Sequence, residues 1–124
     1  MKFKFLIAIL LTGSVVFTSC EDDEVVLGNW VEQAFFEGQA RANGTSFSLN
    51  GNGYFGMGQN ADDYFADFWQ YNPDRNAWTQ VATFPGTPRA FGVSVNTGSK
   101  GYAGLGYDGT NDLSDFWEYN ATTN

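Results

Sequence analysis

The chain has 124 residues, enough for one domain at most, and 43% of them are hydrophobic and 18% aromatic. This apolar content excludes intrinsic disorder for most of the chain. The formal net charge is −8 and all 14 acidic residues follow Cys20, so the surface repels phosphates and nucleic acid is excluded as a partner. The 15 glycines, mixed with aromatic and β-branched residues, are typical of short strands joined by tight turns.

Residues 1–19 have the three zones of an export signal peptide. Lys2 and Lys4 form its positive end, and Phe5–Leu11 forms a short apolar run. A Thr-Gly-Ser sequence at 12–14 interrupts the apolar part, which is too short for a comfortable transmembrane helix. We therefore expect a cleaved leader, and the alternative is an uncleaved anchor helix.

Cys20 is the sole cysteine and stands directly after this leader. With Phe17, Thr18 and Ser19 it resembles the lipobox of bacterial lipoproteins, although Phe17 stands where that motif usually has Leu. The resemblance implies cleavage before Cys20 and a lipid on its side chain. Attachment to a membrane would follow, because each buried CH₂ group contributes roughly 0.8 kcal/mol. The alternative is an unpaired thiol in a plain secreted protein.

Residues 20–29 are predicted to form an acidic tether. Glu21, Asp22, Asp23 and Glu24 repel one another and should stay extended and solvated. The run resembles the acidic surface-export signal that follows the lipobox in Bacteroidetes lipoproteins. That resemblance implies an outer-membrane protein exposed at the cell surface, whereas a simple spacer leaves the periplasmic face open.

An internal repeat dominates the rest of the chain. A shift of 48 residues places Trp30 on Trp78 and gives, without a gap, 18 identities among the 47 pairs from Trp30 to Asn76. The matches are mostly Gly, Trp, Phe, Tyr, Arg and Asp, so low complexity does not explain them. A period near 50 residues indicates a propeller or a solenoid. We divide the chain into repeats at 30–77 and 78–124.

Each repeat predicts four short strands. Thr45–Leu49 alternates polar and apolar residues, as a half-buried strand does, and the Asn and Gly residues at 50–53 predict a tight turn with positive φ. The remaining strands are expected at Tyr54–Gly58, Phe65–Tyr71 and Trp78–Ala82, and in the second repeat at Val93–Asn96, Gly101–Gly106 and Asp115–Tyr119.

These repeats resemble kelch repeats, which have an Arg before the first strand, a glycine pair ending the second, and a spaced Tyr and Trp around the last turn. The matching positions are Trp30, Arg41, Gly56, Gly58, Asp67, Trp69, Tyr71, Trp78, Arg89, Gly104, Gly106, Asp115, Trp117 and Tyr119. One departure is the Gly-x-Gly at 56–58 and 104–106 in place of a doublet. The resemblance, which extends to galactose-oxidase-like propellers, implies an all-β fold of kelch-type β-propeller blades with four antiparallel strands each.

The repeated side chains are expected to serve the fold. Tyr71 and Trp78 flank one hairpin, so their rings are predicted to cover the blade face that packs on the next blade. Arg41 and Arg89 are predicted to hydrogen-bond backbone carbonyls or the carboxylates of Asp67 and Asp115.

No cofactor or metal site is expected. The oxygen-rich sequence Tyr107–Asp112 could hold Ca²⁺, but its spacing is not that of an EF-hand loop, and Asp-Gly turn chemistry explains it better.

About two blades are present, which is too few to close a ring of roughly 4–8. Trp30–Phe36 has the pattern of a fourth strand without a blade before it, and we expect it to complete the last blade of a ring. We therefore expect an N-terminal fragment whose remaining blades lie in a longer chain, with a ring of short chains as the alternative.

Three functions remain open. The first is a lipid-anchored binding or interaction module for a glycan or a protein, in which Tyr64 or Tyr107 could stack on a sugar ring. The second is the N-terminal piece of a carbohydrate-active propeller enzyme with its catalytic residues in later blades. This chain has no His and only one Cys, so it lacks imidazole bases and nucleophile–His pairs. The third is a structural spacer that binds nothing.

Overall fold

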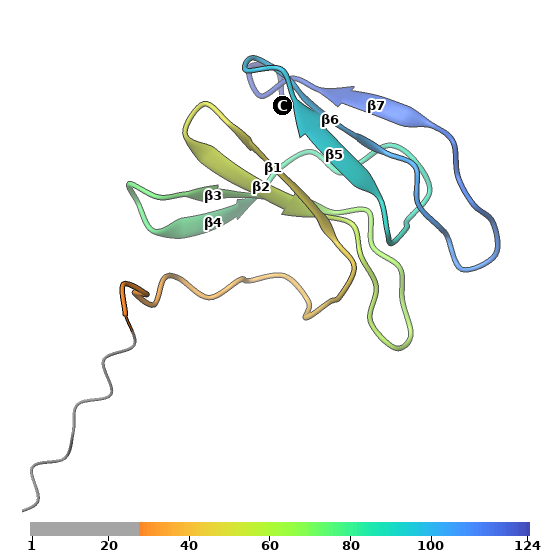
Figure 1. Ribbon diagram of the computed structural model, residues 1–124, viewed down its shortest axis with the longest axis horizontal. Coiled ribbons are helices and arrows are strands. Elements are labelled where there is room, and N and C mark those ends of the chain that lie inside the picture. The colour runs from red at the N-terminus through yellow and green to blue at the C-terminus, as the bar shows by residue number, and fades with distance from the viewer. Residues whose placement is uncertain (1–27) are drawn as a thin grey trace, which may run out of the picture. The chain divides into compact units, whose positions relative to one another are not determined.

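The computed structural model describes residues 28–124 (Figure 1). The chain divides into two compact units, Met1–Trp30 and Val31–Asn124. Of the first unit only Gly28, Asn29 and Trp30 are described, and the Trp30 side chain is exposed. The predictions for the leader, for Cys20 and for the acidic run fall on residues outside the described range.

The unit Val31–Asn124 contains two antiparallel sheets, and residues 28–124 form no helix. In the first sheet, here called blade 1, the strands pair in chain order: β1 (Thr45–Leu49), β2 (Asn52–Gly56), β3 (Phe68–Asn72) and β4 (Ala77–Gln80). The second sheet, blade 2, contains β5 (Val93–Asn96), β6 (Gly101–Gly104) and β7 (Phe116–Tyr119). The all-β prediction is confirmed, as two propeller-like blades of four and three strands.

The β1–β2 hairpin forms as its sequence predicts. Thr45, Phe47 and Leu49 are buried while the two intervening serines are exposed. Asn50 and Gly51 connect the strands with φ values of 52° and 76°. Two successive positive φ values match the right-handed twist of a hairpin, and Asn and Gly adopt them at low cost.

The second strand of each blade ends two residues earlier than expected. Met57 and Gly58 have φ values of 56° and 95°, and Leu105 and Gly106 in blade 2 have 55° and 94°. A left-handed pair cannot continue a ladder, so β2 ends at Gly56. Gly58 must be glycine for a second reason, because a Cβ there would lie 2.6 Å from the Ala42 carbonyl oxygen.

The strand expected at Trp30–Phe36 stays a prediction, because residues 31–36 join no sheet and the last blade that they would complete is not among the described residues. Side chains of blade 1 bind the main chain of Ala34 instead. Its N–H donates to Asn76 Oδ1 at 2.8 Å, and its carbonyl accepts from Trp78 Nε1 at 3.2 Å. The ring of Phe36 then packs edge-on against Trp69 and Trp78. The segment is therefore held against the face of blade 1, not against a strand edge.

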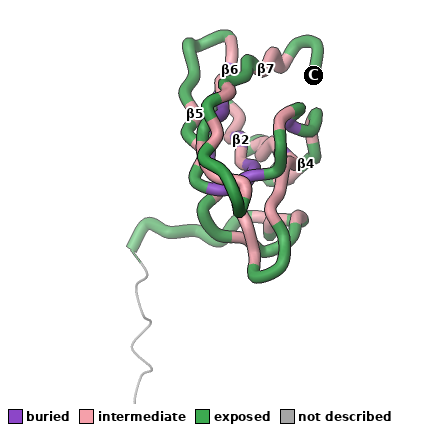
Figure 2. The backbone as a smooth tube through the Cα atoms, turned by 90° about the vertical axis from the view of Figure 1, so that its right-hand side faces the viewer, coloured by how far each residue is buried: buried purple, intermediate pink, exposed green. Residues whose placement is uncertain are grey.

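The core lies between the two blades (Figure 2). We call the side of blade 1 that meets blade 2 its covered face; it carries the buried residues Thr45, Phe47, Tyr54 and Phe68, and Gln70 beside Tyr54. Phe47 stacks on Tyr54 with ring centroids 4.9 Å apart, and Tyr119 of blade 2 lies 5.5 Å from Tyr54.

The opposite side of blade 1, its outer face, carries Ser46, Gly53, Phe55, Trp69, Tyr71 and Trp78. Tyr71 and Trp78 face each other across the β3–β4 hairpin, with centroids 5.1 Å apart. The prediction that these two rings face the next blade is therefore wrong. Strand alternation places them on the side away from blade 2, because Phe68 and Gln70 take the covered face.

Candidate functional site

Arg41 is the centre of a buried cluster in blade 1. Its side chain is 2% exposed and forms a two-pronged ion pair with Asp67, in which Nη2 donates to Oδ2 at 2.9 Å. Nη1 also donates to the carbonyl of left-handed Met57 at 3.2 Å. Trp69 Nε1 donates to the same carboxylate at 2.7 Å, and the guanidinium carbon lies 4.0 Å from the centroid of the Phe65 ring.

Blade 2 repeats this cluster around Arg89, which is 1% exposed. Nη1 and Nη2 donate to Asp115 at 2.5 and 2.9 Å, and Nη1 also donates to the carbonyl of left-handed Leu105 at 3.1 Å. Trp117 Nε1 completes the set at 2.6 Å. The predicted pairing of both arginines with carbonyls and carboxylates is confirmed.

The two aspartates are held in their ionised form. Hydrogen bonds from Arg89 and then from Trp117 lower the pKa of Asp115 to about 2. Burial raises the pKa of Asp67, but the hydrogen bonds from Arg41 and Trp69 outweigh it and leave that pKa below its ordinary value. Both carboxylates accept hydrogen bonds from an arginine and a tryptophan, and each arginine also binds the carbonyl that follows its strand, so the clusters fix the corner at the end of β2 and β6.

The loops that carry Tyr64 and Tyr107 meet each other. The two rings pack edge to face with centroids 6.4 Å apart, and both are half-buried. A Cβ on Gly109 would lie 2.9 Å from the Tyr64 ring. These tyrosines therefore join the loops of the two blades.

The oxygen-rich loop of blade 2 is an Asx turn. Asp108 Oδ1 accepts from the N–H groups of Thr110 at 2.8 Å and Asn111 at 2.6 Å, and these bonds lower the pKa of Asp108. Asn60 holds the equivalent loop of blade 1 in the same way. The prediction of Asp-Gly turn chemistry is confirmed. Within residues 28–124 no three His, Cys, Asp or Glu side chains are grouped so that they could hold a metal ion.

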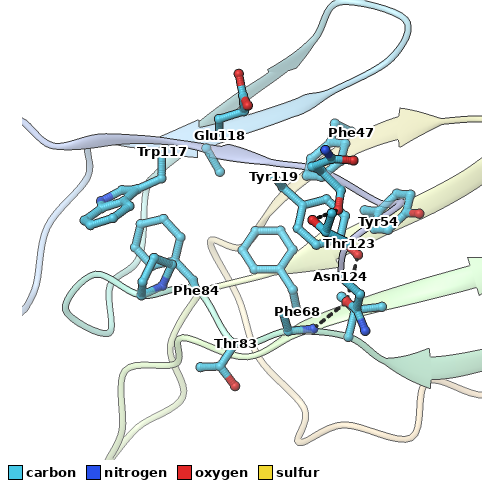
Figure 3. Close-up of a pocket in the computed structure, with 15 residues that line it drawn as sticks. Phe47, Tyr54, Phe68, Thr83, Phe84, Trp117, Glu118, Tyr119, Thr123 and Asn124 are labelled. Atoms are coloured by element: carbon cyan, nitrogen blue, oxygen red, sulfur yellow. Dashed lines mark hydrogen bonds between the residues drawn. The ribbon is translucent and has the colours of Figure 1, made fainter.

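A pocket of about 290 Å³ opens between the blades (Figure 3). Its apolar wall comes from the covered face of blade 1, from the link between the blades and from β7. The side chains that give this wall its aromatic character are Phe47, Tyr54, Phe68, Phe84, Trp117 and Tyr119. Figure 3 shows Trp117, Phe84 and Phe68 in succession along one side of the pocket. Trp117 is 42% exposed, so its ring has a free surface.

The polar groups of this pocket lie at its other end. Tyr119 Oη and the Ala82 N–H both donate to Asn124 Oδ1 at 3.0 Å. Thr123 lies beside this residue in Figure 3. The carboxylate of Glu118 points away, toward Lys100 and Tyr102 on the other side of the sheet. The pocket therefore offers aromatic rings, an amide and a hydroxyl group, with no carboxylate from the described residues turned into it.

Sequence reasoning missed this pocket. The sequence identified Trp117 and Tyr119 only as repeated residues, and their partners in the wall come from Phe84 and its neighbours in the link. The repeat identities at Ala82, Phe84 and Gly86 were the only signal in that link. The pocket is a product of how the blades meet, which no single motif contains.

Comparisons with known proteins support the fold alone. No family model matches the chain, and no curated protein matches it. Among solved structures, one titled "Structure of YjhT" is similar, with a TM-score of 0.52 and 32% identity over 62% of this chain. The chain spans a quarter of the length of that neighbour, 25%. No helix among residues 28–124 is long and apolar enough to span a membrane.

Proposed function

We propose that this chain is a lipid-anchored cell-envelope module of kelch-type blades that binds a ligand, and that a glycan occupies the pocket between the blades. The observation that carries the proposal is the composition of the pocket. Sugar rings present apolar C–H faces and polar edges, and here an exposed indole at Trp117 stands opposite the amide of Asn124. A protein ligand fits this site less well than a sugar, because the pocket has a volume of only about 290 Å³.

The binding step can be tested with a matched pair of tryptophans. Trp69 and Trp117 occupy the same repeat position, and both donate their indole N–H to an aspartate. Only Trp117 lines the pocket. We expect Trp117→Ala to weaken binding of a responding mono- or oligosaccharide about tenfold, the loss of roughly 1.4 kcal/mol of stacking. Trp69→Ala should leave the affinity unchanged.

Titration calorimetry with a panel of sugars is the measurement. Equal losses in the two variants would mean that the indole acts through the fold, and no binding by any sugar would contradict the glycan proposal.

The anchoring step has its own test. Phe17-Thr18-Ser19-Cys20 resembles a lipobox, and Cys20 is the sole cysteine. We expect Cys20→Ser to prevent incorporation of labelled fatty acid and to shift the protein out of the detergent phase in a two-phase extraction. Ser48→Thr, at an exposed serine outside the lipobox, serves as the control. Equal fatty-acid labelling of Cys20→Ser and the parent chain would contradict the lipid anchor. Cleavage of the parent chain by protease added to whole cells would place it at the surface.

A further inference from the structure

Blade 2 has an apolar face that nothing in the described chain covers. The apolar part of this open face consists of Val93, Val95, Tyr102 and Phe116. On the same side, Glu118 lies beside Tyr102 and forms an ion pair with Lys100. Val93 is 47% exposed, Val95 53% and Phe116 49%. Large apolar side chains gathered on one side of a sheet mark a site of interaction.

The internal repeat shows what this face normally meets. Its members are the 48-residue equivalents of Thr45, Phe47, Tyr54 and Phe68, the covered face of blade 1. In blade 1 these four residues are at most 9% exposed, because the opposite side of blade 2 covers them. A Cβ on Gly101 would overlap the Phe47 ring, and Thr45 Oγ1 donates to Ser94 Oγ at 2.8 Å.

The chain also carries the complementary surface. The outer face of blade 1 holds Ser46, Gly53 and Tyr71, the equivalents of Ser94, Gly101 and Tyr119 that cover blade 1 from blade 2. Gly53 is open, since a Cβ there would meet only the Tyr71 Cβ at 3.9 Å. Each copy of the chain therefore holds both halves of the interface found between its own blades.

The proposed contact would pair one large and one small side chain, as the contact between the two blades does, but with the large side chain on the other surface. Inside the chain, the large ring of Phe47 and the small Ala103 belong to one core. The equivalent residues are the small Val95 on the open face of blade 2 and the large Phe55 on the outer face of blade 1, where Phe36 covers part of the Phe55 ring. Volume-conserving exchanges of this kind preserve packing.

The backbone hydrogen bonds between the blades also have equivalents at the proposed contact. Between the blades, Gly58 N–H donates to the Arg89 carbonyl at 2.8 Å, and Phe91 N–H donates to the Asn43 carbonyl at 2.9 Å. A shift of 48 residues would pair Gly106 N–H with the Arg41 carbonyl, and Asn43 N–H with the Phe91 carbonyl. None of these four groups has a hydrogen-bond partner within residues 28–124.

We propose that the open face of blade 2 binds the outer face of blade 1 of a second copy of this chain. The contact is head to tail, because the two surfaces differ, and its repetition gives a ring where the rotation between copies closes. This inference is independent of the glycan pocket.

Disulfide trapping tests the register of this contact. Val93 and Ser46 are the equivalents of Thr45 and Ser94, whose side-chain oxygens lie 2.8 Å apart. Within one copy the two side chains project from opposite, uncovered faces. The full chain with Cys20→Ser, held in mild detergent, is prepared as Val93→Cys and separately as Ser46→Cys. We expect a mixture of the two to form a disulfide-linked dimer under oxidation, and neither alone to do so.

A crosslink within one chain serves as the positive control. Thr45→Cys with Ser94→Cys in one chain should crosslink within the monomer, which verifies the geometry that the proposal repeats. Crosslinking of either single variant with itself to the same extent as the mixture would overturn the proposal. So would a mixture without crosslinks, which would leave the face to a further blade or to another partner.

Complementation gives a second measurement without thiols. Val95→Glu blocks the open face of blade 2 and Gly53→Glu blocks the outer face of blade 1, and each should abolish the oligomer in analytical ultracentrifugation. Mixed together, the two variants retain one intact pair of faces and should form a dimer of one copy each. A monomeric parent chain, or a mixture that stays monomeric, would overturn the proposal.

Discussion

Phe47 in blade 1 and Val95 in blade 2 occupy the same position of the repeat, yet Phe47 is 9% exposed and Val95 53%. The strands that carry them pair in the same register with the next strand, Phe47 with Tyr54 and Val95 with Tyr102. The exposed fractions differ because blade 2 covers Phe47, whereas nothing in the described chain covers Val95. Strand alternation therefore decides which residues share a face, and only a neighbouring sheet decides whether that face is core.

The Arg–Asp clusters show the opposite behaviour. Arg41 and Arg89 make matching bonds to a carboxylate and to a left-handed carbonyl, although the blades have different surroundings. Each cluster is built almost entirely from its own blade and the segment that enters it. Such a unit needs no neighbouring blade to form, so the repeat reproduces it wherever it occurs.

The largest expected change in the free energy of unfolding comes from truncating Phe47, and truncation of its repeat equivalent Val95 is the matched comparison. Phe47→Ala should lower the free energy of unfolding by about 3–5 kcal/mol, since it removes a stacked ring from the centre of the core. Val95→Ala, measured on dilute monomer, should change it by no more than about 0.5 kcal/mol. Urea denaturation followed by tryptophan fluorescence measures both. Similar costs at the two positions would show that blade 2 does not cover blade 1.

A smaller effect is expected at a matched pair of glycines. Gly101→Ala inserts a methyl group into the space of the Phe47 ring and should destabilise the chain by about 1–3 kcal/mol. Gly53→Ala has open space and should be neutral or slightly stabilising, because a glycine in a strand carries excess unfolded-state entropy. Thermal unfolding of the two variants under one set of conditions checks the difference, and a reversed order would contradict the placement of the blades.

The smallest of these effects is the pH dependence of the free energy of unfolding, which depends on the ion pairs in the two Arg–Asp clusters. The pKa of Asp115 is lowered from 3.8 to about 2 in the folded chain, so its ion pair stabilises the fold fully above pH 3.8. That contribution is lost as the pH falls from about 4 to about 2. Asp115→Asn should remove this part of the acid destabilisation, and Asp67→Asn should act with the same sign, because its pKa is also lowered.

Unfolding free energies at a series of pH values between neutral and 2 measure this. An Asp115→Asn variant with the acid sensitivity of the parent chain would show that the Arg89 pair does not set it.

The sequence alone predicted the features that depend on nearby residues. The 48-residue period, the alternating strand Thr45–Leu49 and its Asn-Gly turn were all predicted, because strand patterning and turn φ values are local properties. The pairing of Arg41 with Asp67 was predicted as well, since the motif repeats at fixed spacing and a buried guanidinium requires a partner.

Contacts between distant segments were decided only by the tertiary structure. The strands end early at the left-handed residues Met57 and Leu105, whose carbonyls accept hydrogen bonds from Arg41 and Arg89. Residues 31–36 join neither sheet, and Asn76 and Trp78 bind the main chain of Ala34. The direction in which Tyr71 and Trp78 point, and the pocket beside Trp117, depend on which side of each sheet the other blade covers. A repeat of period 48 fixes what each face contains, but the face that becomes core is chosen by packing, whose free energy resides in the pair of blades and not in either one.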